Sequence, residues 1–188
     1  MKKVVCFWMF LFNIAVYALP AQVLIIRHAE QNHATGELNP FGISRAAALA
    51  EFFQSNATAM RFGPIVACFG ARPHPFHGEN TTRVMDTVSP TAVQLHMPIH
   101  APYAPEEEDL LVNLVLNNPA YDGRTVLIAW HHFSLPILIR AFGYTPPFEH
   151  IPSDDYFYVF VLQYPVVTST PPPTCDYYSQ ALMRGDPP

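Results

Sequence analysis

The chain has 188 residues, of which 50% are hydrophobic and 13% are charged, and it carries a formal net charge of −5. This length and apolar content suffice for one packed domain, and the weakly acidic balance gives no global attraction to nucleic acid or to an anionic membrane. Any site for an anion must therefore be a local feature.

The first 21 residues have the pattern of a secretory signal peptide. Lys2 and Lys3 precede an apolar run, and small residues stand at Ala18 and Ala21. We expect cleavage after Ala18 or Ala21, which predicts an exported protein, periplasmic or secreted, with no stable membrane association after cleavage. The alternative is an uncleaved membrane anchor, but the apolar run is rather short for one and Asn13 interrupts it.

Cleavage would remove Cys6 and leave Cys68 and Cys175 in the mature chain, residues 22–188. An oxidising compartment allows one disulfide between them. The sequence alone does not decide that pairing.

Strand and helix patterns alternate along the mature chain. Short apolar runs rich in β-branched and aromatic residues predict four strands: Val23 to Ile26, Pro64 to Phe69, Thr125 to Trp130 and Tyr156 to Tyr164. Helical patterns lie between or after them: Ile43 to Phe53, TTRVMDTVSPTAVQL with Pro90 expected to break or kink it, PEEEDLLVNLVL, and LPILIRAFG. This order predicts an α/β fold of three layers, with a mostly parallel central sheet and helices on both faces.

The C-terminal part is rich in proline from about residue 165, most densely from Pro171. We expect it to lie along the surface as an extension of the one domain.

Arginine and histidine residues directly follow two of the predicted strands. Arg27 and His28 follow the first strand, and His131 and His132 follow TVLIAW. Ligands of open α/β sheets bind at the carboxyl ends of the strands. We therefore expect these side chains at one edge of the sheet, where an anionic ligand would compensate the cost of burying them.

Four segments, in order, resemble motifs of the histidine phosphatase superfamily, which has the phosphoglycerate mutase-like fold. LIIRHAE is similar to the RHG or RHAE motif, and ELNPFGISRAAALAEFF is similar to the L-T-x-x-G-x-x-Q-A helix start. TTRVMDTV resembles the segment with the second arginine, and TVLIAWHHFSLP resembles the strand and turn with the second histidine. The resemblance extends from Val23 to Val161 and implies a phosphatase that needs no metal or cofactor.

The resemblance also implies roles for single residues. His28 matches the nucleophile that becomes phosphohistidine, and Arg27, Arg83 and His131 match the groups that bind the phosphoryl oxygens. An ungapped reading puts His131 at the catalytic position, so that His132 replaces a small residue and points elsewhere. The acid that protonates the leaving group comes from the segment YAPEEEDL, and the candidates are Glu106, Glu107 and Glu108, with Glu107 the nominal choice.

This chemistry is physically consistent with these residue types. A histidine attacks phosphorus as neutral imidazole, and two nearby guanidinium groups disfavour its protonated form. The same guanidinium groups hold a phosphate dianion through charge-assisted hydrogen bonds. A carboxylic acid protonates the departing alkoxide and, as carboxylate, then activates the water that hydrolyses phosphohistidine.

Four further residues with ionisable side chains have less specific interpretations. Arg72 follows a predicted strand and either lines the pocket or lies in a surface loop, and Glu30 is interpreted as structural. The H-x-x-H spacing of His74 and His77 is a weak metal pattern, since no cysteine or acidic ligand is near it in the sequence.

Two departures from the family pattern bear on substrate access. Phe133 stands where many relatives have a small residue, and the loop GARPHPFHGEN lacks the serine common before the second arginine.

Three hypotheses follow from the sequence. The first is an exported phosphomonoesterase acting through phosphohistidine on a small phosphorylated substrate or a phosphopeptide. The second is a noncatalytic relative that binds an anionic ligand or a protein partner. The third is a metal-dependent hydrolase built on the surplus histidines. The four matched residues of the phosphoryl site favour the first hypothesis.

Overall fold

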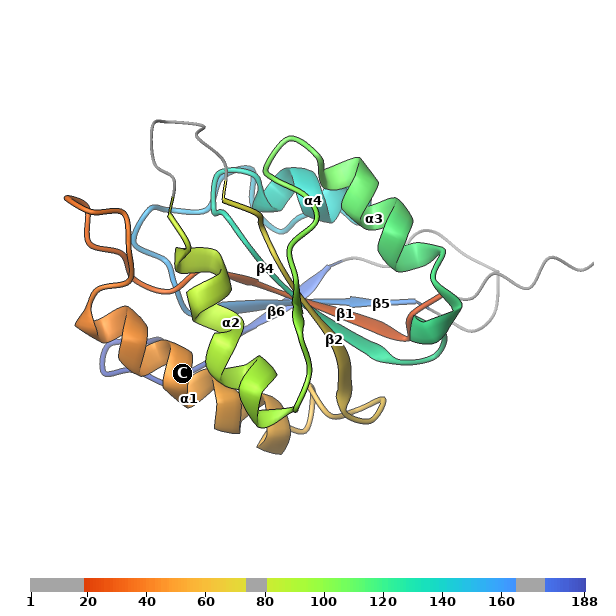
Figure 1. The fold of residues 1–188 in the computed structure, drawn as a ribbon, viewed down its shortest axis with the longest axis horizontal. Coiled ribbons are helices and arrows are strands. Elements are labelled where there is room, and N and C mark those ends of the chain that lie inside the picture. The colour runs from red at the N-terminus through yellow and green to blue at the C-terminus, as the bar shows by residue number, and fades with distance from the viewer. Residues whose placement is uncertain (1–18, 74–80, 165–174) are drawn as a thin grey trace, which may run out of the picture.

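The computed structural model describes residues 19–73, 81–164 and 175–188, which form one mixed sheet with helices on both faces (Figure 1). The expected signal segment up to residue 18, Cys6, His74, His77 and the most proline-rich part of the tail lie outside the described residues. No helix within the described ranges has the length and apolar character needed to cross a membrane.

The sheet has six strands in the order β3-β2-β4-β1-β5-β6. Their bounds are β1 Gln22–Arg27, β2 Ile65–Gly70, β3 Ile99–His100, β4 Thr125–Trp130, β5 Tyr158–Gln163 and β6 Asp176–Ser179. The first four strands in that order pair in parallel, whereas β5 is antiparallel to β1 and β6 is antiparallel to β5. The predicted mostly parallel α/β fold is therefore confirmed.

The two central strands, β1 and β4, contain continuous apolar runs because helices cover both faces of the sheet. Every residue of β1 and of β4 is buried. Helices α1 (Pro40–Ser55) and α2 (Arg83–Gln94) lie on one face, and α3 (Glu108–Leu116) and α4 (Leu135–Ala141) lie on the other (Figure 1). A short 3-10 helix, η2 (Pro119–Tyr121), leads into β4.

Helix α1 begins inside the NPFG stretch, three residues before the predicted start. The Asn39 side chain accepts a hydrogen bond from the Gly42 backbone N–H at 2.9 Å, and Pro40 occupies the first turn, where its missing N–H costs nothing. A Cβ atom at Gly42 would lie 2.2 Å from the carbonyl oxygen of Glu30. Glycine is therefore required there for α1 to approach the segment that follows β1.

Helix α2 continues through Pro90 without a break, so the part of the prediction that Pro90 interrupts the helix is wrong. A proline removes one backbone hydrogen bond from the ladder. The buried face of the helix includes Val84, Val88 and Ala92, on both sides of Pro90 in the sequence. Burial of this continuous apolar face outweighs the lost hydrogen bond.

The described part of the expected surface extension, residues 175–188, contributes a strand to the sheet. Residues Asp176–Ser179 form β6 on the edge of the sheet, and Gln180 is buried. This strand is hard to predict because β6 lies at the edge of the sheet and its sequence, DYYS, has no continuous apolar run. The two-residue strand β3 was not predicted for a similar reason, since it is too short to show a period.

The two cysteines of the described chain are both free and buried. Cys68 lies in β2 and Cys175 directly precedes β6, and three strands separate β2 from β6 in the sheet. Because neighbouring strands lie about 4.8 Å apart, the two thiols are far beyond disulfide reach. The pairing that the sequence left open does not form in this structure.

A buried ion cluster ties the C-terminal segment to α1 and to the loop after β1. Arg45 is buried, donates to both carboxylate oxygens of Glu30 at 2.7 to 3.0 Å and to both of Asp186 at 2.8 Å, and also donates to Gln180 at 3.1 Å. The structural reading of Glu30 agrees with these contacts. One guanidinium thus joins three segments that are distant in the sequence.

Replacing Arg45 with methionine is expected to lower the free energy of unfolding by about 3 to 5 kcal/mol, because two carboxylates then lose the cation that compensates their burial. Arg140→Met is the matched control: it removes an exposed pair with Glu149 and is expected to cost less than about 1 kcal/mol. Urea denaturation of the three proteins measures both values. Equal effects of the two substitutions would contradict a stabilising role of the buried cluster.

Candidate active site

The register of the central strands brings the two histidine motifs together. Arg27 of β1 pairs with Trp130 of β4, so that His28 and His131 leave the sheet side by side. The His28 backbone N–H donates to the Trp130 carbonyl oxygen at 3.0 Å, and the two imidazole centroids lie 5.5 Å apart. The expectation that both strand ends deliver histidines to one edge is confirmed.

The contacts of His28 fix its tautomer. Its Nδ1 lies 2.8 Å from the Ala29 carbonyl oxygen, which can only accept, so Nδ1 carries the proton in the neutral ring. The lone pair then resides on Nε2, which receives an Arg83 Nε–H donor at 3.4 Å. The free nitrogen of this buried imidazole therefore faces a guanidinium group.

Arg83 lies at the start of α2 and reaches both histidines. Its Nη1 donates to the Gly36 carbonyl oxygen at 3.0 Å and to the Thr81 hydroxyl at 2.7 Å, and its Nη2 lies 3.5 Å from His131 Nδ1. A guanidinium only donates, so His131 Nδ1 accepts and the proton of the neutral ring is on Nε2. His131 consequently has an N–H available for an oxygen of a ligand.

Arg27 is buried beside His28, and a loop supplies most of its contacts. Its Nη atoms donate to the carbonyl oxygens of Pro152, Ser153 and Asp155 at 2.8 to 3.2 Å, and its guanidinium lies 3.9 Å from the ring centroid of Tyr156. Its Nε is buried and donates to no group among the described residues. Within the same ranges no carboxylate forms a salt bridge with Arg27, so its direct contacts are carbonyl dipoles and a π face, with Asp154 and Asp155 acting on its charge from farther away.

His132 does not point away from this cluster, so that expectation is wrong. Its ring centroid lies 6.2 Å from that of His28. The next residue, Phe133, stacks on His131 with 5.3 Å between centroids and is 40% exposed. The turn after β4 therefore places two histidines at the site, with an aromatic ring at its rim.

Burial and neighbouring cations keep all three histidines neutral near pH 7. Burial, then the charges of Arg27 and Arg83, holds the pKa of His28 well below its usual range. Burial, then Arg83 and other neighbours, lowers the pKa of His131 to about 3, and burial with Arg27 and Arg83 lowers that of His132 to about 4. Burial lowers the pKa of Arg27 to about 10, which leaves it charged.

The three candidate glutamates occupy different environments. Glu107 accepts from Arg72 at 3.0 Å and from the Ala104 backbone N–H at 2.8 Å. Glu108 is buried and accepts from the Trp130 indole N–H at 3.0 Å, which ties α3 to the end of β4. Glu106 has a positive φ of 79°. Arg72 and Glu107 thus pair near the carboxyl end of β2, the strand beside β4.

Two further residues, Tyr156 and Thr87, complete the site. Tyr156 lies against Arg27 and also 6.0 Å from the ring of His28, at the start of the segment that leads into β5. Because β5 is antiparallel to β1, its beginning meets the carboxyl ends of the parallel strands. The Thr87 hydroxyl donates to the Arg83 carbonyl oxygen at 2.7 Å and accepts from the Ala29 backbone N–H at 2.9 Å, which links α2 to the segment that follows His28.

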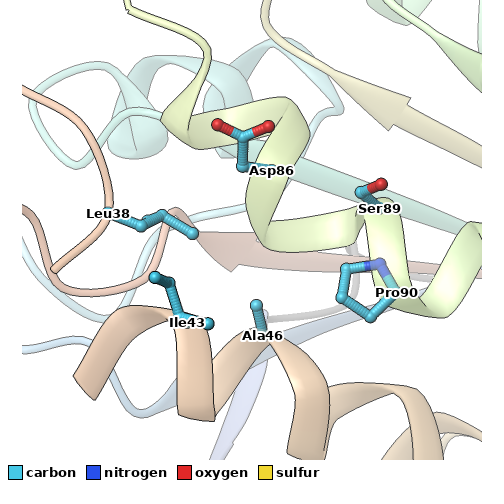
Figure 2. A pocket seen from close by; sticks show the side chains of 6 residues that line it. All are labelled: Leu38, Ile43, Ala46, Asp86, Ser89 and Pro90. Carbon is cyan, nitrogen blue, oxygen red and sulfur yellow. The ribbon is translucent and has the colours of Figure 1, made fainter. Parts of the chain in front are cut away.

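A hollow of about 270 Å³ lies between α1 and α2 (Figure 2). It is lined by Leu38, Ile43, Ala46, Asp86, Ser89 and Pro90. None of the predicted site residues lines it, although Asp86 is one turn along α2 from Arg83. Across 19–73, 81–164 and 175–188, no group of three or more His, Cys, Asp or Glu side chains is arranged to hold a metal ion.

No protein-family model and no curated protein matches the chain. Among solved structures, those similar to this chain include three SixA proteins. The first is the protein histidine phosphatase SixA complexed with tungstate, at 17% identity over 74% of this chain and 86% of that chain. The others are candidate SixA phosphohistidine phosphatases from Agrobacterium tumefaciens, at 16% identity over 77% and 90%, and from Nakamurella multipartitia, at 17% over 78% and 86%.

All three comparisons have a TM-score of 0.45. At this similarity they establish no activity for the chain, and its function has to be inferred from its own residues.

The neutral histidines predict how stability depends on pH. An unfolded histidine titrates near 6.5, so acidification below that value protonates His131 and His132 in the unfolded chain before the folded one. The free energy of unfolding should therefore fall as the pH is lowered from about 6.5 towards 4. Urea denaturation across this range should give a smaller pH slope for the His131→Asn/His132→Asn variant than for the unmodified protein.

The control for this prediction is His96→Asn, which makes the same substitution at an exposed histidine. A double variant with the same slope as the unmodified protein would contradict neutral, desolvated histidines in the folded state.

Proposed function

We propose that this protein hydrolyses phosphate monoesters through a phosphohistidine intermediate on His28. The observation that carries the proposal is the environment of His28 Nε2, a lone pair that burial and adjacent guanidinium groups keep unprotonated in a site with unused N–H donors. A neutral imidazole is a nucleophile, and a cationic site without a described carboxylate partner for Arg27 suits a phosphate dianion.

The first step transfers the phosphoryl group to the enzyme. The His28 Nε2 lone pair attacks phosphorus while the bond from phosphorus to the ester oxygen breaks. Negative charge spreads over the equatorial oxygens in this transition state, and Arg27, Arg83 and the His131 Nε2–H stabilise it by donating hydrogen bonds. The departing oxygen takes a proton from Glu107, our nominal acid.

The second step releases inorganic phosphate. The Glu107 carboxylate accepts a proton from water as the water oxygen attacks phosphorus, and the bond from phosphorus to Nε2 breaks. His28 returns to its neutral form. Because Arg72 and the Ala104 N–H favour the carboxylate form of Glu107, its role as an acid requires that it exchange these contacts for the ester oxygen.

The setting of this activity is also a proposal. The basic and apolar N-terminus supports export after cleavage at Ala18 or Ala21, and the exposed Phe133 at the rim of the site supports a small phosphorylated substrate or a phosphopeptide with an apolar part. We propose neither a metal nor an organic cofactor for the reaction.

Rapid quench with ³²P-labelled substrate should trap a phosphoenzyme that is labile to acid and stable to base, because the P–N bond breaks when the imidazole is protonated. His28→Ala should abolish both the adduct and turnover, whereas the exposed-site control His96→Ala should retain them. Turnover in the His28→Ala variant, or an active enzyme that forms no adduct, would overturn the mechanism.

Glu107→Gln should lower kcat/KM for alkyl phosphates by about 10²-fold or more, the usual contribution of a general acid. The loss should be much smaller for p-nitrophenyl phosphate, whose leaving group departs with little protonation. Steady-state kinetics with both substrates tests this, with Glu106→Gln as the neighbouring control. Equal losses for the two substrates would remove Glu107 from the role of acid.

A further inference from the structure

We infer that His132 is an additional ligand of the phosphoryl group, donating a hydrogen bond from its Nδ1 to a phosphoryl oxygen. The inference rests on the proposed function and adds a residue to it. His28, His131 and the two arginines are the residues that the family motifs match. His132 lies outside that set, and its position in the structure assigns it to the same site.

The first support is an unsatisfied buried atom. His132 Nδ1 is buried and has no hydrogen-bond partner within the described residues. A buried polar atom without a partner is costly, so a ligand oxygen that accepts from it is favoured. Arg27 Nε is a second such atom.

The second support is that these two atoms belong to groups that surround the same nucleophile. Arg27 directly precedes His28, and the His132 ring lies 6.2 Å from the His28 ring at an interplanar angle of 76°. His132 also lies close enough to Arg27 to feel its charge. One oxyanion placed against His28 Nε2 would accept from both unsatisfied nitrogens, whereas an apolar ligand would leave both unpaired.

The third support is that the two adjacent histidines differ in the contacts of their Nδ1 atoms. His131 uses its Nδ1 to accept from Arg83 Nη2 and therefore offers only Nε2–H to a ligand. His132 has no such contact at Nδ1, so its neutral ring is free to carry the proton there. His131 would then donate to the phosphoryl group from Nε2 and His132 from Nδ1. Each of the two consecutive histidines would thus contribute its own hydrogen bond.

The test uses side-chain amides that mimic each ring nitrogen. Asparagine places its amide nitrogen near the position of Nδ1, whereas glutamine places it near Nε2. We expect His132→Asn to bind inorganic phosphate within about threefold of the unmodified protein, and His132→Gln and His132→Ala to bind about tenfold more weakly, the usual effect of one hydrogen bond to a charged group. Isothermal titration calorimetry measures the Kd values, and His96→Asn is the surface control.

A second readout does not depend on any variant. In ¹⁵N NMR spectra of the unmodified protein, saturation with inorganic phosphate should place the His132 proton on Nδ1.

Several results would overturn the inference. Phosphate affinity in His132→Gln equal to that of the unmodified protein, equal losses in the Asn and Gln variants, or a bound state with the proton on Nε2 alone would each exclude the Nδ1 contact and leave the proposed function standing. An unmodified protein that neither binds phosphate nor forms the His28 adduct would overturn both proposals.

Discussion

The burial of a permanent cation beside a neutral imidazole is the constraint on which the site depends. Arg27 ends β1, one of two fully buried strands, and His28 follows it directly, at a place where a charge is costly unless dipoles or a counter-ion compensate it. Three loop carbonyls and the Tyr156 ring compensate Arg27 in part, and His28 avoids the cost by staying neutral. What remains is a site with positive potential and unused N–H donors, the physical definition of an oxyanion site.

The rest of the molecule holds that arrangement in place. Thr87 ties the backbone after His28 to α2, and Glu30 is held by Arg45, which Asp186 of the C-terminal segment also contacts. The close approach at Gly42 brings α1 to the same loop. Stability and the orientation of His28 are thus linked, because one short segment after β1 takes part in both.

The parts of the fold that sequence could predict are those with a strong local pattern. The run Thr125–Trp130 and the apolar core of β1 are buried on both faces, so their composition reveals them. Strand β6 forms by pairing with β5, and Tyr156 reaches the site because β5 runs antiparallel to β1. Neither feature can be read from a local sequence pattern. The position of His132 was predicted wrongly for a similar reason: a motif gives the order of residues in a turn, but the turn geometry decides which rings lie near His28.

The most direct test of the central claim is a crystal structure of the protein with orthovanadate, which adopts the trigonal bipyramidal geometry of a transferring phosphoryl group. We expect vanadium bonded to His28 Nε2, with equatorial oxygens in contact with Arg27, Arg83 and His131. Vanadate bound elsewhere, or held in this pocket without a bond to His28 Nε2, would contradict His28 as the nucleophile.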